Sequence, residues 1–358
     1  MTNIPQSLMN LRCPEGIGTI DDILESHQRY QVLLAALDLG LFEFLNRKGP
    51  GNRNEIAEGI GINGVFSHDF LNVLVEAGLI TLDGELYCNA RAATDFLLRG
   101  NPFYQGDVVR NVIRHSSWSN LSAALTRNEP AQGKGSSSTG PNTTFISALG
   151  QRALRGELQA VTRAISGWRG FRDARRILDV GGGHGLYTIA LCQANPLLKG
   201  IVLDQASVVD SATHYIAEHG LTDRITAVTG DICSDSIGSG YDIVLISHLL
   251  YKFRKNLAPI FETVRASLNP RGLFVSNHWF CAPGCATGES AVQGLSKALQ
   301  SFSHPLCREE EFDRLFDEKG FSLVTTTSAM TAFGPTRLQL AERRGNAQSI
   351  TPFSNAGE

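Results

Sequence analysis

The residues best suited to chemistry gather where short apolar runs end. One such run, RRILDV, includes Asp179 and leads into the turn GGGHG, with Gly181, Gly183 and Gly185. Glycines at a strand-to-helix turn let the backbone come close to a ligand, and the helix that follows points unpaired N–H groups at it. The spacing therefore predicts a nucleotide-like ligand at this turn.

Acidic residues also mark the ends of the next two apolar runs. Asp204 closes GIVLD, and Asp231 follows RITAVTG. The first carboxylate can accept two hydrogen bonds from ribose hydroxyls, and the second can accept one from an adenine amino group. A dinucleotide fingerprint would need glycine at position 186, where the chain has Leu186. The set predicts an adenosine pocket, although each acid taken alone could be a helix cap or turn residue.

The stretch ISHLLYKF follows another apolar run and contains His248 and Tyr251. Tyrosine has an ordinary pKa of about 10, so Tyr251 is better suited to orienting a substrate than to accepting its proton. His248 lies one helical turn away and stays a candidate for the same site. His278, in SNHWF, has a reference pKa of about 6.5 and is the better base candidate. The alternative for His278 is a hydrogen-bonded histidine at a strand end, and the sequence leaves both open.

A cluster of histidines and cysteines near position 280 raises the possibility of a metal site. Its members lie within 30 residues: His278, Cys281, Cys285, His304 and Cys307. The spacing matches neither a C-x2-C pair nor an H-x3-H pair, so we expect buried thiols and no metal.

Strand-like and helix-like segments alternate over residues 170–344. Five short β-branched runs are separated by segments of helix length, which predicts a mostly parallel, doubly wound α/β sheet. The runs FSLVTTTSA and TRLQLAER, separated only by a short turn, predict a closing antiparallel hairpin.

The first hundred residues have a different pattern. Residues 24–46 predict a long helix, and the block after position 53 predicts a short helix, a second helix and a two-stranded wing around LDGE. This is a winged-helix pattern, but its second helix carries Asp69, Asn72 and Glu76 and would read DNA poorly. We therefore expect an interaction module. Residues 128–143, rich in Gly, Ser and Pro, predict a loop.

Composition limits the remaining possibilities. The 358 residues are 42% hydrophobic, which is enough for two cores, and the net charge is −3. Such a balance argues against nucleic-acid binding, and no run is long and apolar enough to suggest a membrane span. Seven cysteines without a disulfide framework fit reduced thiols. We expect a cytoplasmic protein.

These motifs together resemble the S-adenosylmethionine-dependent O-methyltransferases of the caffeate and polyketide type. LDVGGGHG is similar to their first motif, Asp204 to their ribose acid and TGDI to their adenine motif. The resemblance implies a Rossmann-like, seven-stranded class I methyltransferase domain at 169–345 and a winged-helix dimerisation domain at 1–105. Linking helices that carry the substrate pocket would occupy 106–168, with a disordered tail at 346–358. It also implies a homodimer.

The resemblance also assigns residues. It implies cofactor contacts from the glycine turn and from the strand-end residues Asp179, Asp204, Gln205, Asp231, Ile232 and Ser247, and a substrate wall from His115, Trp118, Phe145 and Leu149. The family's catalytic histidine is replaced by Tyr251, and Ser247 stands where a basic residue is usual. Tyr251, His278 and His248 are thus the catalytic candidates.

The sequence predicts methyl transfer from S-adenosylmethionine to a small aromatic or polyketide-like metabolite, with oxygen as the first choice of acceptor and carbon as the second. One alternative is an enzyme that binds the same cofactor but catalyses a non-methylating step. Another is a winged-helix regulator with a ligand-sensing domain.

Overall fold

The structure is a computed structural model that describes residues 9, 12–114, 117–126, 143–281, 290–301, 306 and 308–345. The chain divides into two compact units, Met1–Val109 and Arg110–Glu358. The predicted loop at 128–143, except its last residue, and the predicted tail at 346–358 lie outside the described residues, as do His115, Cys285, His304 and Cys307.

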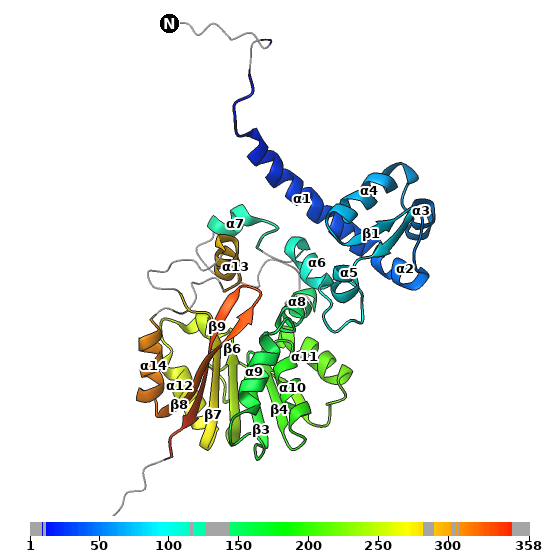
Figure 1. Cartoon of the computed structure of the whole chain (residues 1–358). Coiled ribbons are helices and arrows are strands. Elements are labelled where there is room, and N and C mark those ends of the chain that lie inside the picture. Colours follow the sequence, from blue (N-terminus) through cyan, green and yellow to red (C-terminus); the bar gives the residue numbers. More distant parts are fainter. Residues whose placement is uncertain are drawn as a thin grey trace, which may run out of the picture. The chain divides into compact units, whose positions relative to one another are not determined.

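The first unit is mostly helical and contains a small hairpin (Figure 1). Its elements are α1 (Ile17–Asp38), α2 (Leu41–Lys48), α3 (Arg53–Ile60), α4 (Gly64–Glu76), β1 (Ile80–Asp83), β2 (Leu86–Asn89) and α5 (Arg91–Phe96). The strands β1 and β2 pair antiparallel around a tight turn, and Gly84 in this turn has a φ of 61°. The order of short helix, second helix and hairpin is the one that the sequence predicts.

Local signals explain where these helices begin and how they pack. Asn52 accepts hydrogen bonds from the backbone N–H groups of Asn54 and Glu55, while the Glu55 carboxylate accepts from the Asn52 N–H, so α3 begins with a capping box. Phe42 and Leu71 are fully buried in the core of this unit. The hydrophobic contacts of α2, α4 and β2 thus converge on one small core.

The second unit is built on a seven-stranded sheet with the order β5-β4-β3-β6-β7-β9-β8. The strands are β3 (Arg176–Val180), β4 (Lys199–Asp204), β5 (Ile225–Thr229), β6 (Tyr241–Ser247), β7 (Leu268–His278), β8 (Phe321–Thr331) and β9 (Gly334–Arg343). The first five pair in parallel, and β9 pairs antiparallel with both β7 and β8. Both the predicted parallel sheet and its closing hairpin are confirmed.

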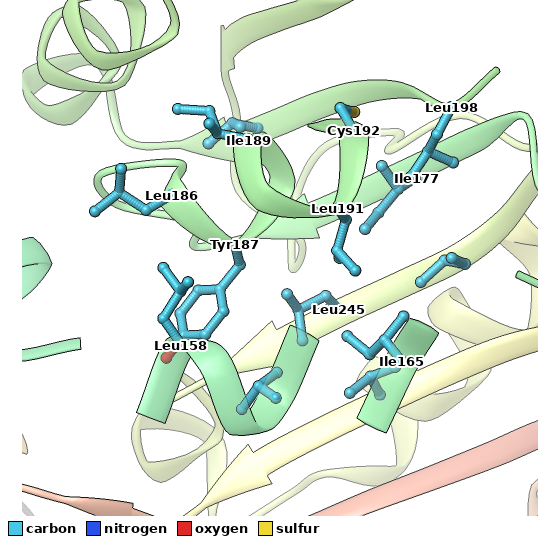
Figure 2. Close-up of a cluster of buried hydrophobic side chains, with 14 of the residues drawn as sticks. Leu158, Ile165, Ile177, Leu186, Tyr187, Ile189, Leu191, Cys192, Leu198 and Leu245 are labelled. Atoms are coloured by element: carbon cyan, nitrogen blue, oxygen red, sulfur yellow. The ribbon is translucent and has the colours of Figure 1, made fainter. Parts of the chain in front are cut away.

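Alternate residues of the central strands supply two different cores. On β6, Ile243 and Leu245 face one core, and Val244 and Ile246 face the other. The first core is covered by α9 (Glu157–Ser166), α10 (Leu186–Ala194) and α11 (Ala206–Glu218). Figure 2 shows Leu186, Tyr187 and Leu191 of α10 gathered with Leu158 and Ile165 of α9. The second core is covered by α12 (Ala258–Ser267) and α14 (Glu309–Glu318), so the sheet is the middle layer of three.

The remaining described helices are α6 (Gly106–Arg114), α7 (Leu121–Thr126), α8 (Thr143–Ala153), α13 (Ala291–Ser301) and a short 3₁₀ helix, η2 (Leu250–Phe253). Helix α8 packs beside the start of α10, because a Cβ added to Gly150 would lie 3.1 Å from the Leu186 side chain. None of the described helices is long and apolar enough to cross a membrane.

Candidate active site

The glycine turn joins β3 to α10 with left-handed backbone. Gly181, Gly183 and Gly185 have φ values of 68°, 57° and 71°, a region that side chains rarely adopt. The Gly181 N–H donates to the Leu203 carbonyl, which ties the turn to the end of β4. A Cβ on Gly183 would meet no atom within 4 Å. The turn therefore presents bare backbone to open space, as a close-lying ligand requires.

Asp179 lies beneath this turn. Its side chain is 1% exposed and accepts a hydrogen bond from the Thr188 hydroxyl, and a Cβ on Gly182 would lie 2.7 Å from its carboxyl carbon. Burial raises the pKa of Asp179 to about 7. The carboxyl group therefore packs against the turn and supports it, and its predicted contact with the cofactor stays a prediction. The sequence alone could not show where the Asp179 side chain lies, since a residue at a strand end can point to either face of the sheet.

The two other predicted acids stand at neighbouring strand ends. The half-buried Asp204 accepts hydrogen bonds from the Gly183 N–H at 2.8 Å and from the Gln205 N–H at 2.7 Å, so it lies directly against the glycine turn. Asp231, after β5, is exposed, as is Gln205. Ile232 is buried in the core on the α12 side. Because β3, β4 and β5 are adjacent and parallel, their carboxyl ends place the glycines and both acids along one edge.

His248 is the first residue after β6 and has an unusual backbone. Its φ is 54°, which is costly for a residue with a side chain and is often found at functional sites. Its Nε2 lies 2.7 Å from Oε1 of Glu157, and its Nδ1 lies 3.0 Å from the Tyr251 hydroxyl. The Trp279 ring packs against the imidazole, with 4.2 Å between centroids. The side chain is 24% exposed, so one part of the imidazole stays open.

Glu157, the first residue of α9, is the buried partner of His248. Its side chain is 8% exposed, and its Oε1 also accepts a hydrogen bond from the Asn277 amide at 2.8 Å. Burial alone would raise the pKa of Glu157, but attraction by His248 and hydrogen bonds from His248, Tyr187 and Asn277 outweigh it and lower the pKa. The carboxylate is therefore ionised. The same Asn277 amide donates to the Ser247 hydroxyl.

His278 is placed differently from the base candidate that the sequence suggests. It is fully buried, and its Nε2 accepts hydrogen bonds from the backbone N–H groups of Leu249 and Leu250. Its Nδ1 therefore carries the proton and donates to the Ser276 hydroxyl at 3.0 Å. Burial lowers its pKa well below the ordinary range. The alternative of a hydrogen-bonded histidine at a strand end describes it, and its role is to hold the η2 turn.

Aromatic rings continue from His248 across the neighbouring loops. Trp279 meets Phe333 edge to face at 5.8 Å, the Arg152 guanidinium lies over Phe333 at 5.0 Å, and Lys297 Nζ lies 5.5 Å from the centre of the Trp279 ring. Arg152 is on α8. The predicted wall residues Phe145 and Leu149 are also on α8 and half-buried, and Trp118, also half-buried, precedes α7.

A seven-stranded sheet of this order, with a glycine turn after its first strand and acids at the next two strand ends, defines a class I S-adenosylmethionine-dependent methyltransferase. A family model described as an O-methyltransferase domain matches residues 139–322. The chain therefore belongs to the O-methyltransferase family and is a methyltransferase that uses S-adenosylmethionine on a small molecule. This membership does not support the alternative of a transcriptional regulator.

Individual relatives agree with this assignment. A 3-hydroxy-5-methyl-1-naphthoate 3-O-methyltransferase of Streptomyces sahachiroi is 30% identical over 246 residues, 65% of this chain and 68% of that protein. The N,N-dimethyltransferase OxyT of Streptomyces rimosus is 28% identical over 311 residues, 83% of this chain and 88% of that protein. The structure of human N-acetylserotonin methyltransferase with S-adenosylmethionine has a TM-score of 0.73 at 18% identity, covering 93% of this chain and 99% of that one, which shows a shared fold.

Sequence reasoning missed Glu157 altogether. It precedes the first strand by about twenty residues and belongs to no motif, and only the fold brings it to His248, which is 91 positions away. The one available signal was an acid at the start of an otherwise apolar helix face, in GELQAVTRAI. Such acids usually stabilise a helix end, so the signal is weak.

Proposed function

We propose that this enzyme methylates a hydroxyl oxygen of a small aromatic metabolite. The observation that carries the proposal is a row of rings, in which Trp279 packs on His248 and Phe333 meets Trp279 edge to face. Flat apolar rings bind a flat aromatic acceptor, and a hydroxyl on such an acceptor needs a proton acceptor close by. The Streptomyces sahachiroi relative is named for methyl transfer to a naphthoate oxygen, which agrees with this choice.

The cofactor residues follow from the geometry of the strand edge. We infer that the Asp204 carboxylate, which lies against the glycine turn, binds the ribose hydroxyls and that the exposed Asp231 binds the adenine amino group. The glycine turn and the start of α10 would lie along the methionine part, with Gln205, Ile232 and Ser247 lining the rest. When bound, the cofactor supplies an activated methyl group.

A charged group on the acceptor would suit the ring wall. Arg152 packs over Phe333, and no carboxylate among the described residues pairs with it. Burial, with repulsion from Arg155 second, lowers its pKa to about 10, so the guanidinium stays charged in a poorly hydrated place. A carboxylate on the acceptor would neutralise it, and we therefore favour aromatic hydroxy acids.

The test is a panel of hydroxybenzoates and hydroxynaphthoates beside the matching neutral phenols and anilines, each incubated with S-adenosylmethionine. We expect S-adenosylhomocysteine to form together with a product that carries one added methyl on oxygen, and the hydroxy acids to be preferred at least tenfold. Arg152→Ala should remove the preference. Methylation only at carbon or nitrogen, or of none of the panel, would contradict the choice of acceptor.

We further infer that the first unit is a winged-helix dimerisation module and that the enzyme works as a homodimer in the cytoplasm, without nucleic acid or membrane. Helix α4 carries no lysine or arginine for a phosphate backbone. Helix α1 has an exposed apolar stripe, described below, that suits a second copy of the same helix. Cys13, Cys88, Cys192 and Cys233, in the described part of the chain, are free thiols, which fits a reducing compartment.

A further inference from the structure

We propose that Glu157, His248 and Tyr251 form a carboxylate–imidazole–hydroxyl line in which His248 takes the proton of the acceptor hydroxyl. The inference rests on the proposed function, because it supplies the base for that transfer. It assigns His248 as the catalytic residue and Glu157 as its positioning residue.

The hydrogen-bond partners of His248 determine which of its ring nitrogens carries the proton. An ionised carboxylate can only accept, so the 2.7 Å contact with Glu157 requires a proton on Nε2 of His248. In the neutral imidazole Nδ1 is then the acceptor, and the Tyr251 hydroxyl donates to it at 3.0 Å. The Tyr251 oxygen in turn accepts a hydrogen bond from the backbone N–H of Trp279 at 2.6 Å. The nitrogen able to take a proton is therefore Nδ1.

The position of His248 suits the transfer. Val180 of β3 pairs with Ile246 of β6, so the residues that follow each strand lie side by side. A Cβ on Gly181 would lie 2.9 Å from the Leu249 side chain, which places the residue after His248 against the cofactor turn. The partly exposed imidazole thus stands next to the place from which a methyl group would come.

The methyl transfer balances in protons and electrons as a single displacement step. As the acceptor oxygen bonds to the methyl carbon, the carbon–sulfur bond of the cofactor breaks and its electron pair stays on sulfur. The hydroxyl proton moves to Nδ1 of His248, from which the Tyr251 O–H turns away by rotation about its carbon–oxygen bond. The imidazolium keeps its Nε2 proton on Glu157, whose negative charge balances it. Tyr251 remains held by the Trp279 N–H.

Neighbouring groups explain why His248, and not His278, is the residue that accepts the proton. Glu157 is the acid that faces His248, and α9 places it there at its first residue. His278, 6.4 Å away between ring centres, gives its Nε2 to two backbone N–H groups and stays neutral. His278 thus holds the turn with a nitrogen fixed by backbone groups, whereas Nδ1 of His248 has a hydroxyl partner that can rotate away.

The first experiment tests the contact between His248 and Glu157 without measuring enzyme activity. ¹⁵N-histidine spectra of the full chain distinguish Nε2–H from Nδ1–H, and the signal of His248 is the one lost in His248→Gln. We expect the Nε2–H form in the wild type, because the Glu157 carboxylate can only accept, and a larger share of the Nδ1–H form in Glu157→Gln. An unchanged tautomer of His248 in Glu157→Gln, or an Nδ1–H form in the wild type, would overturn the inference.

The second experiment measures methyl transfer with the best acceptor of the panel. We expect His248→Gln to lower kcat roughly a hundred- to ten-thousand-fold and Glu157→Gln at least tenfold, with cofactor affinity by calorimetry changed less than threefold. The control is Glu342→Gln, which removes another shielded carboxylate that accepts from Trp168 and Arg169. It should keep kcat within twofold. An unchanged kcat in His248→Gln with normal methylation would sink the inference alone, whereas absence of O-methylation in the wild type would count against the proposed function.

Discussion

At the scale of single residues, this site depends on groups held in unfavourable states. Asp179 is a carboxyl group without water, and His248 has left-handed backbone. Both states are tolerated because neighbouring groups hold them in place. Thr188 and the glycine turn enclose Asp179. Glu157, Tyr251 and Trp279 contact the His248 ring. The burial of Asp179 has a consequence for stability that can be measured.

Asp179 should make stability fall with pH. Its folded pKa of about 7 is above the ordinary 3.8, so the folded state binds a proton more tightly than the unfolded state. Its contribution is therefore fully present below about pH 4 and is lost as the pH rises towards 7, with an upper limit of about 4 kcal/mol. Asp179→Asn should flatten the slope of the unfolding free energy between pH 4 and 7. The exposed Asp173→Asn is the control, and an equal slope in wild type and Asp179→Asn would refute the prediction.

Gly183 allows a comparison between two similar glycines. Gly183 and Gly61 both have left-handed φ, at 57° and 71°, and a Cβ at either would meet no atom within 4 Å. Alanine at each should cost about 1 kcal/mol of unfolding free energy through backbone strain. Calorimetry should show S-adenosylmethionine affinity at least tenfold weaker in Gly183→Ala and unchanged in Gly61→Ala. Equal affinities in both variants would mean that the cofactor does not approach this turn.

At the scale of elements, α1 is the least explained helix. Among its 22 residues only Ala36 and Leu37, near its end, are buried. The first turns carry exposed apolar side chains at helical spacing, namely Ile17, Ile20, Ile23 and Leu24. A helix with such a stripe usually has a partner, and a second copy of the chain fits because isologous contacts pair a stripe with itself.

A charge in the stripe should therefore disrupt the proposed dimer. In sedimentation experiments we expect Leu24→Asp to raise the dimer dissociation constant at least a hundredfold, since it buries an unpaired carboxylate at the contact. Ser26→Asp adds the same charge to the same helix outside the stripe and should leave the dimer intact. A monomeric wild type, or a dimer indifferent to Leu24→Asp, would contradict this role for α1.

At the scale of the whole molecule, all the proposed cofactor contacts belong to the second unit. Binding of S-adenosylmethionine should therefore stabilise that unit, because a ligand that binds only the folded state adds a free energy of RT ln(1 + L/Kd), where L is the free ligand concentration. The first unit has its own core, which includes Phe42, Leu45, Ile56 and Leu71.

Scanning calorimetry of the full chain tests this. At a cofactor concentration one hundred times its Kd, the gain is about 2.7 kcal/mol, which corresponds to a rise in Tm of roughly 5 to 10 °C for a unit of this size. Asp204→Ala should reduce the rise severalfold by removing the carboxylate at the glycine turn. An equal rise in Asp204→Ala at the same cofactor concentration would exclude Asp204 from the binding site.

The sequence by itself determined the architecture. The seven strands were visible as β-branched runs, and these runs, the glycine spacing and the strand-end acids are local properties of the sequence. The cofactor class and the family followed from the same local signals.

Only the tertiary structure decided how the side chains around His248 are used. Glu157 and His248 are 91 positions apart, and no periodicity connects them. The sequence favoured His278 over Tyr251 as a base on pKa and kept His248 as a candidate, but His278 is buried with its Nε2 held by two backbone N–H groups, whereas His248 meets a carboxylate and stays partly exposed. Burial and hydrogen-bond partners arise from packing between distant segments, and that information is absent from local sequence.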